Sequence, residues 1–115
     1  MAHERYEACI EACEICAAEC ESCATDCLNE EDVKMMARCI RLDRSCADIC
    51  TLAAREMARS SQFAERLCQL CAEVCEVCAE ECARHEAEHC QRCAQACRDC
   101  AEECRAMAGT EAERM

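Results

Sequence analysis

Proline is absent from this sequence, and glycine occurs once, at Gly109. β-sheet architectures that are rich in tight turns need both residues, so their scarcity argues against an all-β fold. Alanine, glutamate, arginine and cysteine dominate the composition instead, and the first three are good helix formers. The composition therefore predicts a helical chain.

Large apolar side chains are also scarce. Leu, Ile, Val and Phe together number only 13 in a chain of 115 residues (five Leu, four Ile, three Val and one Phe), and the formal net charge is −12. Such a composition is typical of disordered proteins. Much of the remaining apolar content is Ala together with 19 Cys. Either the chain does not fold, or cysteine fills the core that Leu and Ile fill elsewhere.

Basic patches and targeting segments are missing as well. The acidic balance argues against nucleic acid and against an anionic membrane surface as partners, and it favours a cation as ligand. Residues 1–14 contain no charged run followed by an apolar one, and no stretch approaches transmembrane length. We therefore expect a cytoplasmic protein whose reduced thiols bind metal instead of forming disulfides.

The cysteines recur at steps of three and four residues, with one step of seven between Cys39 and Cys46. Steps of three and four follow one face of an α-helix, whereas the two-residue period of a strand would put successive thiols on opposite faces. The segments 71–82 and 93–104 also align without gaps, which indicates an internal repeat. The pattern thus predicts a stripe of thiols along each helix. The positions are Cys9, Cys13, Cys16, Cys20, Cys23, Cys27, Cys39, Cys46, Cys50, Cys68, Cys71, Cys75, Cys78, Cys82, Cys90, Cys93, Cys97, Cys100 and Cys104.

The expected fold class is all-α, an antiparallel four-helix bundle with a Cys-lined core, in a single domain over residues 1–115. The connections are only a few residues long, so neighbouring helices should be antiparallel. Asn29 is expected to cap the second helix and Ser60 or Ser61 the third, while Gly109 suits the end of the fourth. The expected helices cover residues 3–28, 30–59, 61–84 and 86–108, followed by a tail at 109–115.

Many of the cysteines form i,i+4 pairs, which on a helix lie about 5–6 Å apart on one face. Two thiolates at this spacing can hold a soft monovalent ion, and thiolates select Cu(I). One Cu(I) per thiolate leaves the core neutral, whereas Zn(II) in four-cysteine sites would leave two negative charges per site. We therefore expect Cu(I) in many copies, on the order of 15–20 ions per chain if every thiol is used. The pairs are 9/13, 16/20, 23/27, 46/50, 71/75, 78/82, 93/97 and 100/104.

Three other interpretations of the cysteines are weaker. Cysteine can act as a small hydrophobe in a purely structural bundle, but 19 in register carry an oxidation hazard that Ala or Val would avoid. A disulfide scaffold is disfavoured because i,i+4 side chains on a helix run nearly parallel. Cys20, Cys23 and Cys27 approach the spacing of an iron–sulfur electron-transfer protein, yet here the spacing continues over whole helices without the usual Pro. Because no catalytic constellation is present, we expect no enzyme activity.

One end of the predicted bundle, which we call the mouth, gathers four further metal-binding side chains. Imidazole and thioether groups bind Cu(I) and release it more readily than thiolate pairs do, so this is where metal is expected to enter. The alternative is that they are surface histidines and gap-filling methionines. The opposite end holds both aromatic residues, Tyr6 and Phe63, together with Met57, and is expected to be a closed apolar plug. The candidate ligands at the mouth are Met35, Met36, His85 and His89.

The chain resembles the cytosolic branch of the bacterial copper storage proteins. The resemblance covers Cys9 to Met107, and its most specific parts are CAEVCEVCAEECARHEAEHCQRCAQACRDCAEECRAM (residues 71–107) and the CxxxC pairs of the first helix. It implies many Cu(I) ions held along the core by the cysteines named above, and a homotetramer. It also implies copper homeostasis, with detoxification as a consequence of storage. The role of Cys39 is open, because no cysteine lies four residues from it. Cys68 and Cys90 also lack such a partner, which suggests that they bridge between helices.

Overall fold

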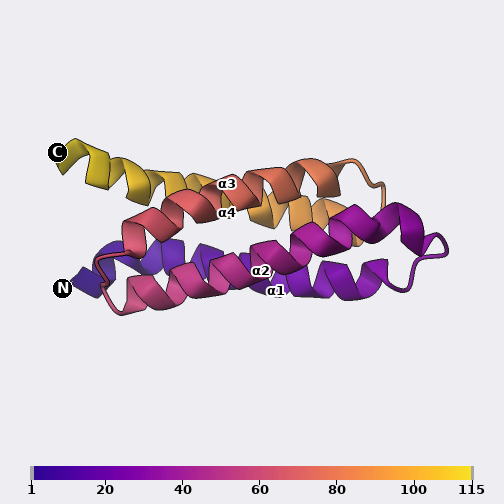
Figure 1. Ribbon diagram of the computed structural model, residues 1–115, viewed down its shortest axis with the longest axis horizontal. Coiled ribbons are helices and arrows are strands. Elements are labelled where there is room, and N and C mark those ends of the chain that lie inside the picture. Colours follow the sequence, from indigo (N-terminus) through magenta and orange to yellow (C-terminus); the bar gives the residue numbers. More distant parts are fainter. Residues whose placement is uncertain (1, 115) are drawn as a thin grey trace.

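The computed structural model describes residues 2–114, and every regular element in this stretch is helical (Figure 1). The helices form where cysteine and alanine recur on one face and charged residues on the other, with no proline to interrupt them. A short 3₁₀ helix precedes each of the first two α-helices. The elements are η1 (Ala2–Tyr6), α1 (Glu7–Cys27), η2 (Val33–Met36), α2 (Ala37–Ala58), α3 (Ala64–Ala83) and α4 (Glu88–Arg114).

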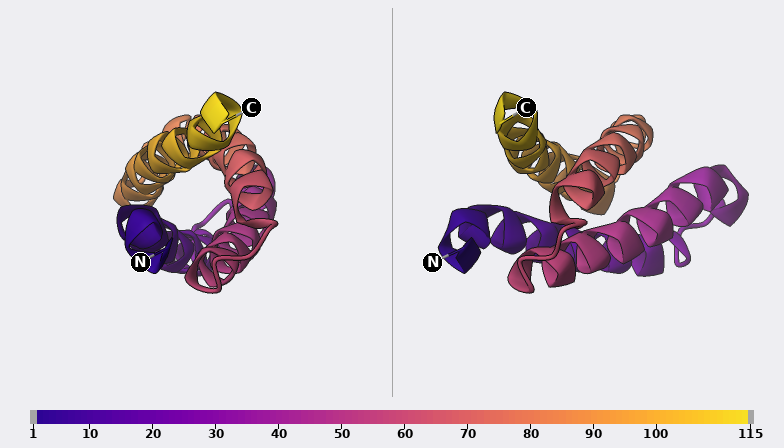
Figure 2. Two further views of the ribbon diagram at one scale, coloured as in Figure 1. Left: turned by 90° about the vertical axis from the view of Figure 1, so that its left-hand side faces the viewer. Right: turned by 60° about the vertical axis from the view of Figure 1, so that its left-hand side comes forward.

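The four α-helices run up, down, up and down along a rod of 49 × 20 × 18 Å. Figure 1 places both termini and the α2–α3 turn at one end, and the α1–α2 and α3–α4 connections at the other. Seen along the rod, the helices form a ring around one axis (Figure 2). The predicted antiparallel four-helix bundle is therefore confirmed. None of its helices, within the described residues, is both long and apolar enough to cross a membrane.

Cysteine and alanine make up most of the core. All 19 thiols are free and buried, and no cysteine exposes more than 1% of its surface. The buried alanines include Ala47, Ala72, Ala79 and Ala94, each of which directly follows an inward-facing residue of its helix. Small residues at these positions let the helices approach closely, so the thiols of different helices meet on the axis.

The second helix begins later than expected. Asn29 does not cap it, because the Asn29 side chain turns back to donate to the carbonyl of Thr25. Asp32 instead caps the 3₁₀ helix η2 that leads into α2, and its carboxylate accepts from the backbone N–H of Met35. The residues between α1 and η2 thus form an irregular turn, and this turn places Glu30 at the mouth.

Ser60 ends α2 instead of starting α3. It has a positive φ of 54°, and the N–H groups of Ser60 and Ser61 donate to the carbonyls of Met57 and Glu56. This is a Schellman motif in which Ser takes the place usually held by Gly. Ser61 also accepts from the backbone N–H of Phe63 through its side chain, so it supports the turn that leads into α3.

The prediction that the fourth helix ends at Gly109 is wrong, since α4 continues to Arg114. Gly109 does not use its conformational freedom, because it has no positive φ. The residues after it, TEAER, contain good helix formers and no proline, so nothing in the sequence forces the helix to stop there.

Candidate metal centre

Each helix contributes one stripe of thiols, as the three-four spacing predicts. Within a helix, i,i+4 sulfur atoms lie 3.8 Å apart in Cys71 and Cys75 and 3.9 Å apart in Cys16 and Cys20. These distances come directly from the helical repeat, which stacks such side chains on one face.

Several contacts between helices are shorter than those within a helix. The sulfur atoms of Cys46 on α2 and Cys75 on α3 lie 3.5 Å apart. Cys9 on α1 is 3.6 Å from Cys104 on α4. A thiol therefore has neighbours across the axis as well as along its own helix, and the CxxxC pairs are parts of larger groups.

These larger groups are quartets whose four sulfur atoms all lie within 4.8 Å of one another. Several quartets share members, and Cys16 and Cys46, for example, occur together in more than one of them. Shared sulfurs suit bridging thiolates and monovalent ions, because separate four-cysteine zinc sites need ligands of their own. The quartets include Cys13/Cys71/Cys100/Cys104, Cys16/Cys46/Cys50/Cys75, Cys16/Cys20/Cys46/Cys97, Cys20/Cys78/Cys93/Cys97 and Cys23/Cys27/Cys39/Cys90.

A carboxylate that sequence reasoning missed lies inside the thiol core. Asp43 is fully buried, and its Oδ1 accepts from Cys78 at 3.3 Å, Cys93 at 3.3 Å and Cys82 at 3.4 Å. The sequence contains a signal for this role of Asp43. The spacing between Cys39 and Cys46 is seven residues, and Asp43 divides it into the steps of four and three residues that separate the other cysteines within each helix. Asp43 is thus the residue that takes the next place after Cys39 in the α2 stripe.

The surroundings of Asp43 favour its protonated form. Burial, followed by the nearby Cys93, Cys78 and Cys39 thiols, raises the pKa of the Asp43 carboxyl to about 10. Because the carboxyl is neutral over the physiological range, the metal-free core can enclose it without an isolated negative charge.

At the mouth, His89 is the histidine that reaches the thiols. Its Nδ1 lies 3.5 Å from the sulfur atoms of both Cys23 and Cys90, and its Nε2 lies 2.9 Å from Oε1 of Glu30. Cys90 in turn lies 3.9 Å from Cys23 and 4.0 Å from Cys27 on α1, as expected for a cysteine that bridges helices. His89 therefore closes the last quartet of the core at the mouth.

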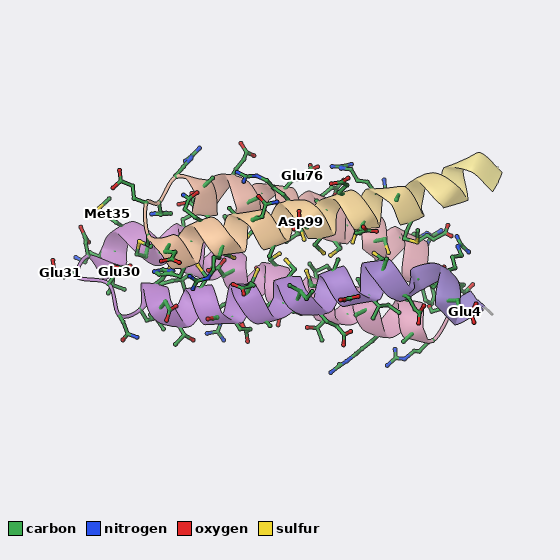
Figure 3. The ribbon with its side chains drawn as sticks, turned by 180° about the vertical axis from the view of Figure 1, so that it is seen from behind. Glu4, Glu30, Glu31, Met35, Glu76 and Asp99 are labelled. Carbon is green, nitrogen blue, oxygen red and sulfur yellow. The ribbon has the colours of Figure 1, made fainter. Side chains whose placement is uncertain are left out.

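The other three candidates at the mouth are placed differently. His85 forms a hydrogen bond through Nε2 to Glu81 at 2.8 Å, and Glu81 also accepts from Arg38 at 3.1 Å. Met36 is buried, but Met35 is 68% exposed and points outward (Figure 3). The structure thus brings His89 to a thiol quartet, leaves Met35 in solvent, and ties His85 to a carboxylate.

Two thiols next to the mouth, Cys27 and Cys90, hold their protons firmly. Burial, followed by the nearby Cys39 thiol, raises the pKa of Cys90 to about 12. Burial also raises the pKa of Cys27 above its usual range. A metal ion that binds these sulfurs must therefore displace protons.

The opposite end of the bundle is only partly the apolar plug that was expected. Tyr6 and Met57 are buried, and the Met57 thioether accepts from the Cys68 thiol at 3.5 Å. Phe63 is 49% exposed, so its expected place in the plug is wrong. The reason is that Phe63 lies in the α2–α3 turn, just before α3 begins.

Comparison with known proteins links the thiol core to copper. A family model described as copper storage protein matches residues 2–109. An uncharacterised cysteine-rich protein of Bacillus subtilis, YhjQ, is 53% identical over 87 residues, which are 75% of this chain and 81% of that protein.

Two solved structures similar to this chain have copper in their descriptions. The Cu(I)-bound copper storage protein BsCsp3 has a TM-score of 0.87 at 52% identity, covering 90% of this chain and 98% of that one. A cytosolic copper storage protein from Streptomyces lividans, described with five coppers, has a TM-score of 0.89 at 40% identity over 94% of this chain and 95% of its own.

Proposed function

The chain belongs to the copper storage protein family, and from this premise we propose that it stores Cu(I) in the cytosol at high capacity. The observation that carries the proposal is that all 19 cysteines are buried and free, and that most of them form quartets with shared sulfur atoms. Protection from copper toxicity follows from storage. The family is one of storage proteins, and the role proposed is binding without catalysis.

Storage in this core is an exchange of protons for copper. Each thiol releases one proton and each Cu(I) brings one positive charge, so a site of one ion per thiolate stays neutral. A buried core can accept many such exchanges, because uncompensated charge is what makes ion burial costly. Thiolates that bridge neighbouring ions suit the shared quartets.

We propose all 19 cysteines as copper ligands, with His89 as a further ligand at the mouth, where copper enters. The position of His89 Nδ1 at 3.5 Å from two thiols supports this role. His85 and Met36 are secondary candidates there, since the former is paired with Glu81 and the latter is buried. Met35 is the weakest candidate because its side chain is exposed.

The proposal includes a homo-oligomer, with a tetramer as the expected size, formed through the seam between α2 and α3. This seam contains three apolar side chains that are 41–44% exposed, and each directly precedes an inward-facing residue of its helix. They are Leu52, Leu70 and Val77. The exposed Arg41 and Arg44 make α2 basic in a chain of net charge −12. A second copy supplies both an apolar face and the acidic surface that complements α2.

The test of storage is an anaerobic titration of the reduced protein with Cu(I) in competition with a chromophoric chelator. We expect saturation at roughly one ion per thiol, on the order of 15–20 per chain. A sample blocked by a thiol alkylating reagent after unfolding is the control, and it should bind almost none. Saturation at about one to four ions would contradict storage, because that number fits a chaperone, a regulator or isolated zinc-type sites.

A further inference from the structure

The turn between α1 and α2 reaches across the mouth to the start of α4. Glu30 lies in this turn, and its Oε1 is 2.9 Å from Nε2 of His89. The Glu30 side chain is 38% exposed, while that of His89 is only 14% exposed. Figure 3 shows Glu30 at the end of the bundle beside Glu31, which is the next residue of the same turn. The ring of His89 is therefore held between this turn and the thiol core.

This hydrogen bond determines the tautomer of His89, and therefore which of its two ring nitrogens has a free lone pair. An ionised carboxylate only accepts hydrogen bonds, so the Nε2 atom bonded to Glu30 carries the proton. In the neutral ring, Nδ1 is then the unprotonated nitrogen. Nδ1 is the atom that lies 3.5 Å from the sulfurs of Cys23 and Cys90.

Resting on the proposed function, we infer that Glu30 is a positioning residue for copper loading. It fixes the tautomer and the orientation of His89, so that the Nδ1 lone pair points at the outermost thiol quartet. A carboxylate on the far side of a histidine also makes the ring a more basic ligand. Glu30 itself does not touch the metal in this arrangement, and it acts only through His89.

The second histidine at the mouth provides an internal comparison. His85 has the same kind of carboxylate partner, since its Nε2 lies 2.8 Å from Oε2 of Glu81. Among the described contacts, however, only His89 also has a thiol within hydrogen-bond distance. A carboxylate pairing by itself therefore does not define the loading site, and the combination of Glu30, His89 and two thiols does.

The kinetic test measures how fast reduced protein takes up acetonitrile-stabilised Cu(I), supplied at one ion per chain in an anaerobic stopped-flow instrument. We expect Glu30→Ala to slow loading about 3- to 10-fold, which is at or below the roughly 10-fold lower limit for outer-shell partners, because Glu30 is partly solvated. Glu30→Gln keeps an acceptor oxygen and should restore part of the rate. The matched control is Glu31→Gln, which removes the same charge from the same turn at an exposed position and should leave the rate unchanged.

A double variant separates positioning from attraction of the cation. Combined with His89→Ala, the change Glu30→Ala should cause no further slowing, because Glu30 acts through the ring. Equal slowing by Glu31→Gln, or additive slowing in the double variant, would overturn the inference in favour of simple charge attraction.

The tautomer is read directly in the metal-free protein by two-bond ¹H–¹⁵N correlation spectra of the histidine rings. We expect the His89 proton on Nε2 in the wild type and a mixture of tautomers in Glu30→Ala. An unchanged tautomer and an unchanged loading rate would overturn the inference. A wild-type capacity of only a few ions would instead overturn the storage function, and the spectrum of the metal-free ring separates the two failures.

Discussion

At the scale of single residues, Asp43 is the side chain that most distinguishes this core from a plain stack of thiols. It is fully buried, and its pKa of about 10 lies far above the usual 3.9 of an aspartate. Between these two values the folded chain binds a proton that the unfolded chain has lost. The stabilising effect is complete below about pH 4 and is lost progressively as the pH rises towards about 10.

This linkage predicts the effect of Asp43→Asn. The metal-free, reduced wild type should lose stability between pH 5 and pH 8, by at most about 1.4 kcal/mol per pH unit from this group. Asparagine has the same shape and an acceptor oxygen for the thiols but does not ionise, so the variant should show a flatter dependence. Urea unfolding at several pH values measures the difference. Parallel slopes for the two proteins would mean that Asp43 does not bind an extra proton on folding.

At the scale of elements, α2 is followed by a residue whose backbone strain a substitution can relieve. Ser60 has a φ of 54° in its Schellman motif. The left-handed conformation costs a non-glycine residue about 1–2 kcal/mol, while glycine loses about 0.5–1 kcal/mol through its greater freedom when unfolded. Ser60→Gly should therefore stabilise the protein by about 0.5–1 kcal/mol in urea unfolding.

Ser61, the next residue, is expected to respond to substitution in the opposite way. Ser61 uses its side chain to contact Glu56 and the backbone of Phe63. Ser61→Ala should destabilise the protein by about 1 kcal/mol, because one N–H of the turn loses its acceptor. If Ser60→Gly destabilised as much as Ser61→Ala, conformational strain at Ser60 would not be the dominant effect.

The seam between α2 and α3 leads to a prediction about assembly. Leu70→Glu combined with Val77→Glu adds two negative charges to an exposed apolar strip. We expect the oligomer to dissociate while the helix content is retained, because neither side chain is part of the thiol core. Sedimentation velocity measures the assembly, and circular dichroism measures the helix content.

The control for assembly lies on α1. Ile15 is 53% exposed and precedes an inward-facing cysteine in the same way, but on a helix outside the α2–α3 seam. Ile15→Glu should leave the assembly intact. An oligomer that survives the double α3 variant, or that is lost in Ile15→Glu, would mean that a different face forms the interface.

At the scale of the whole molecule, copper loading should acidify the solution. The raised pKa of Cys90, to about 12, and of Cys27 means that these mouth thiols are protonated in the metal-free protein at neutral pH. Each Cu(I) that binds one of these protonated thiols displaces a proton, so charge at the mouth stays balanced. We expect roughly one proton per ion bound, measured by pH-stat during anaerobic titration. Release of much less would mean that the core is already ionised before copper arrives.

The helical stripe of thiols could be predicted from local sequence, because the three-four repeat is set by backbone geometry alone. Cys71 and Cys75 lie together on any helix, whatever surrounds them. The scarcity of Leu and Ile further required that these thiols be the core. Fold class, burial of the cysteines and preference for a soft monovalent ion all follow from those two facts.

Contacts between helices could not be predicted from the sequence, since they depend on how the four helices are aligned and on how each turn is built. Only the tertiary structure decided that Cys46 contacts Cys75 and that Asp43 accepts from thiols of α3 and α4. It also decided that His89 contacts sulfur atoms whereas His85 contacts a carboxylate. Met35 and Met36 are adjacent in sequence, yet one is exposed and the other buried. The physical reason is that a helix fixes its own faces locally, whereas the sulfur atoms that share an ion come together only through packing between distant segments.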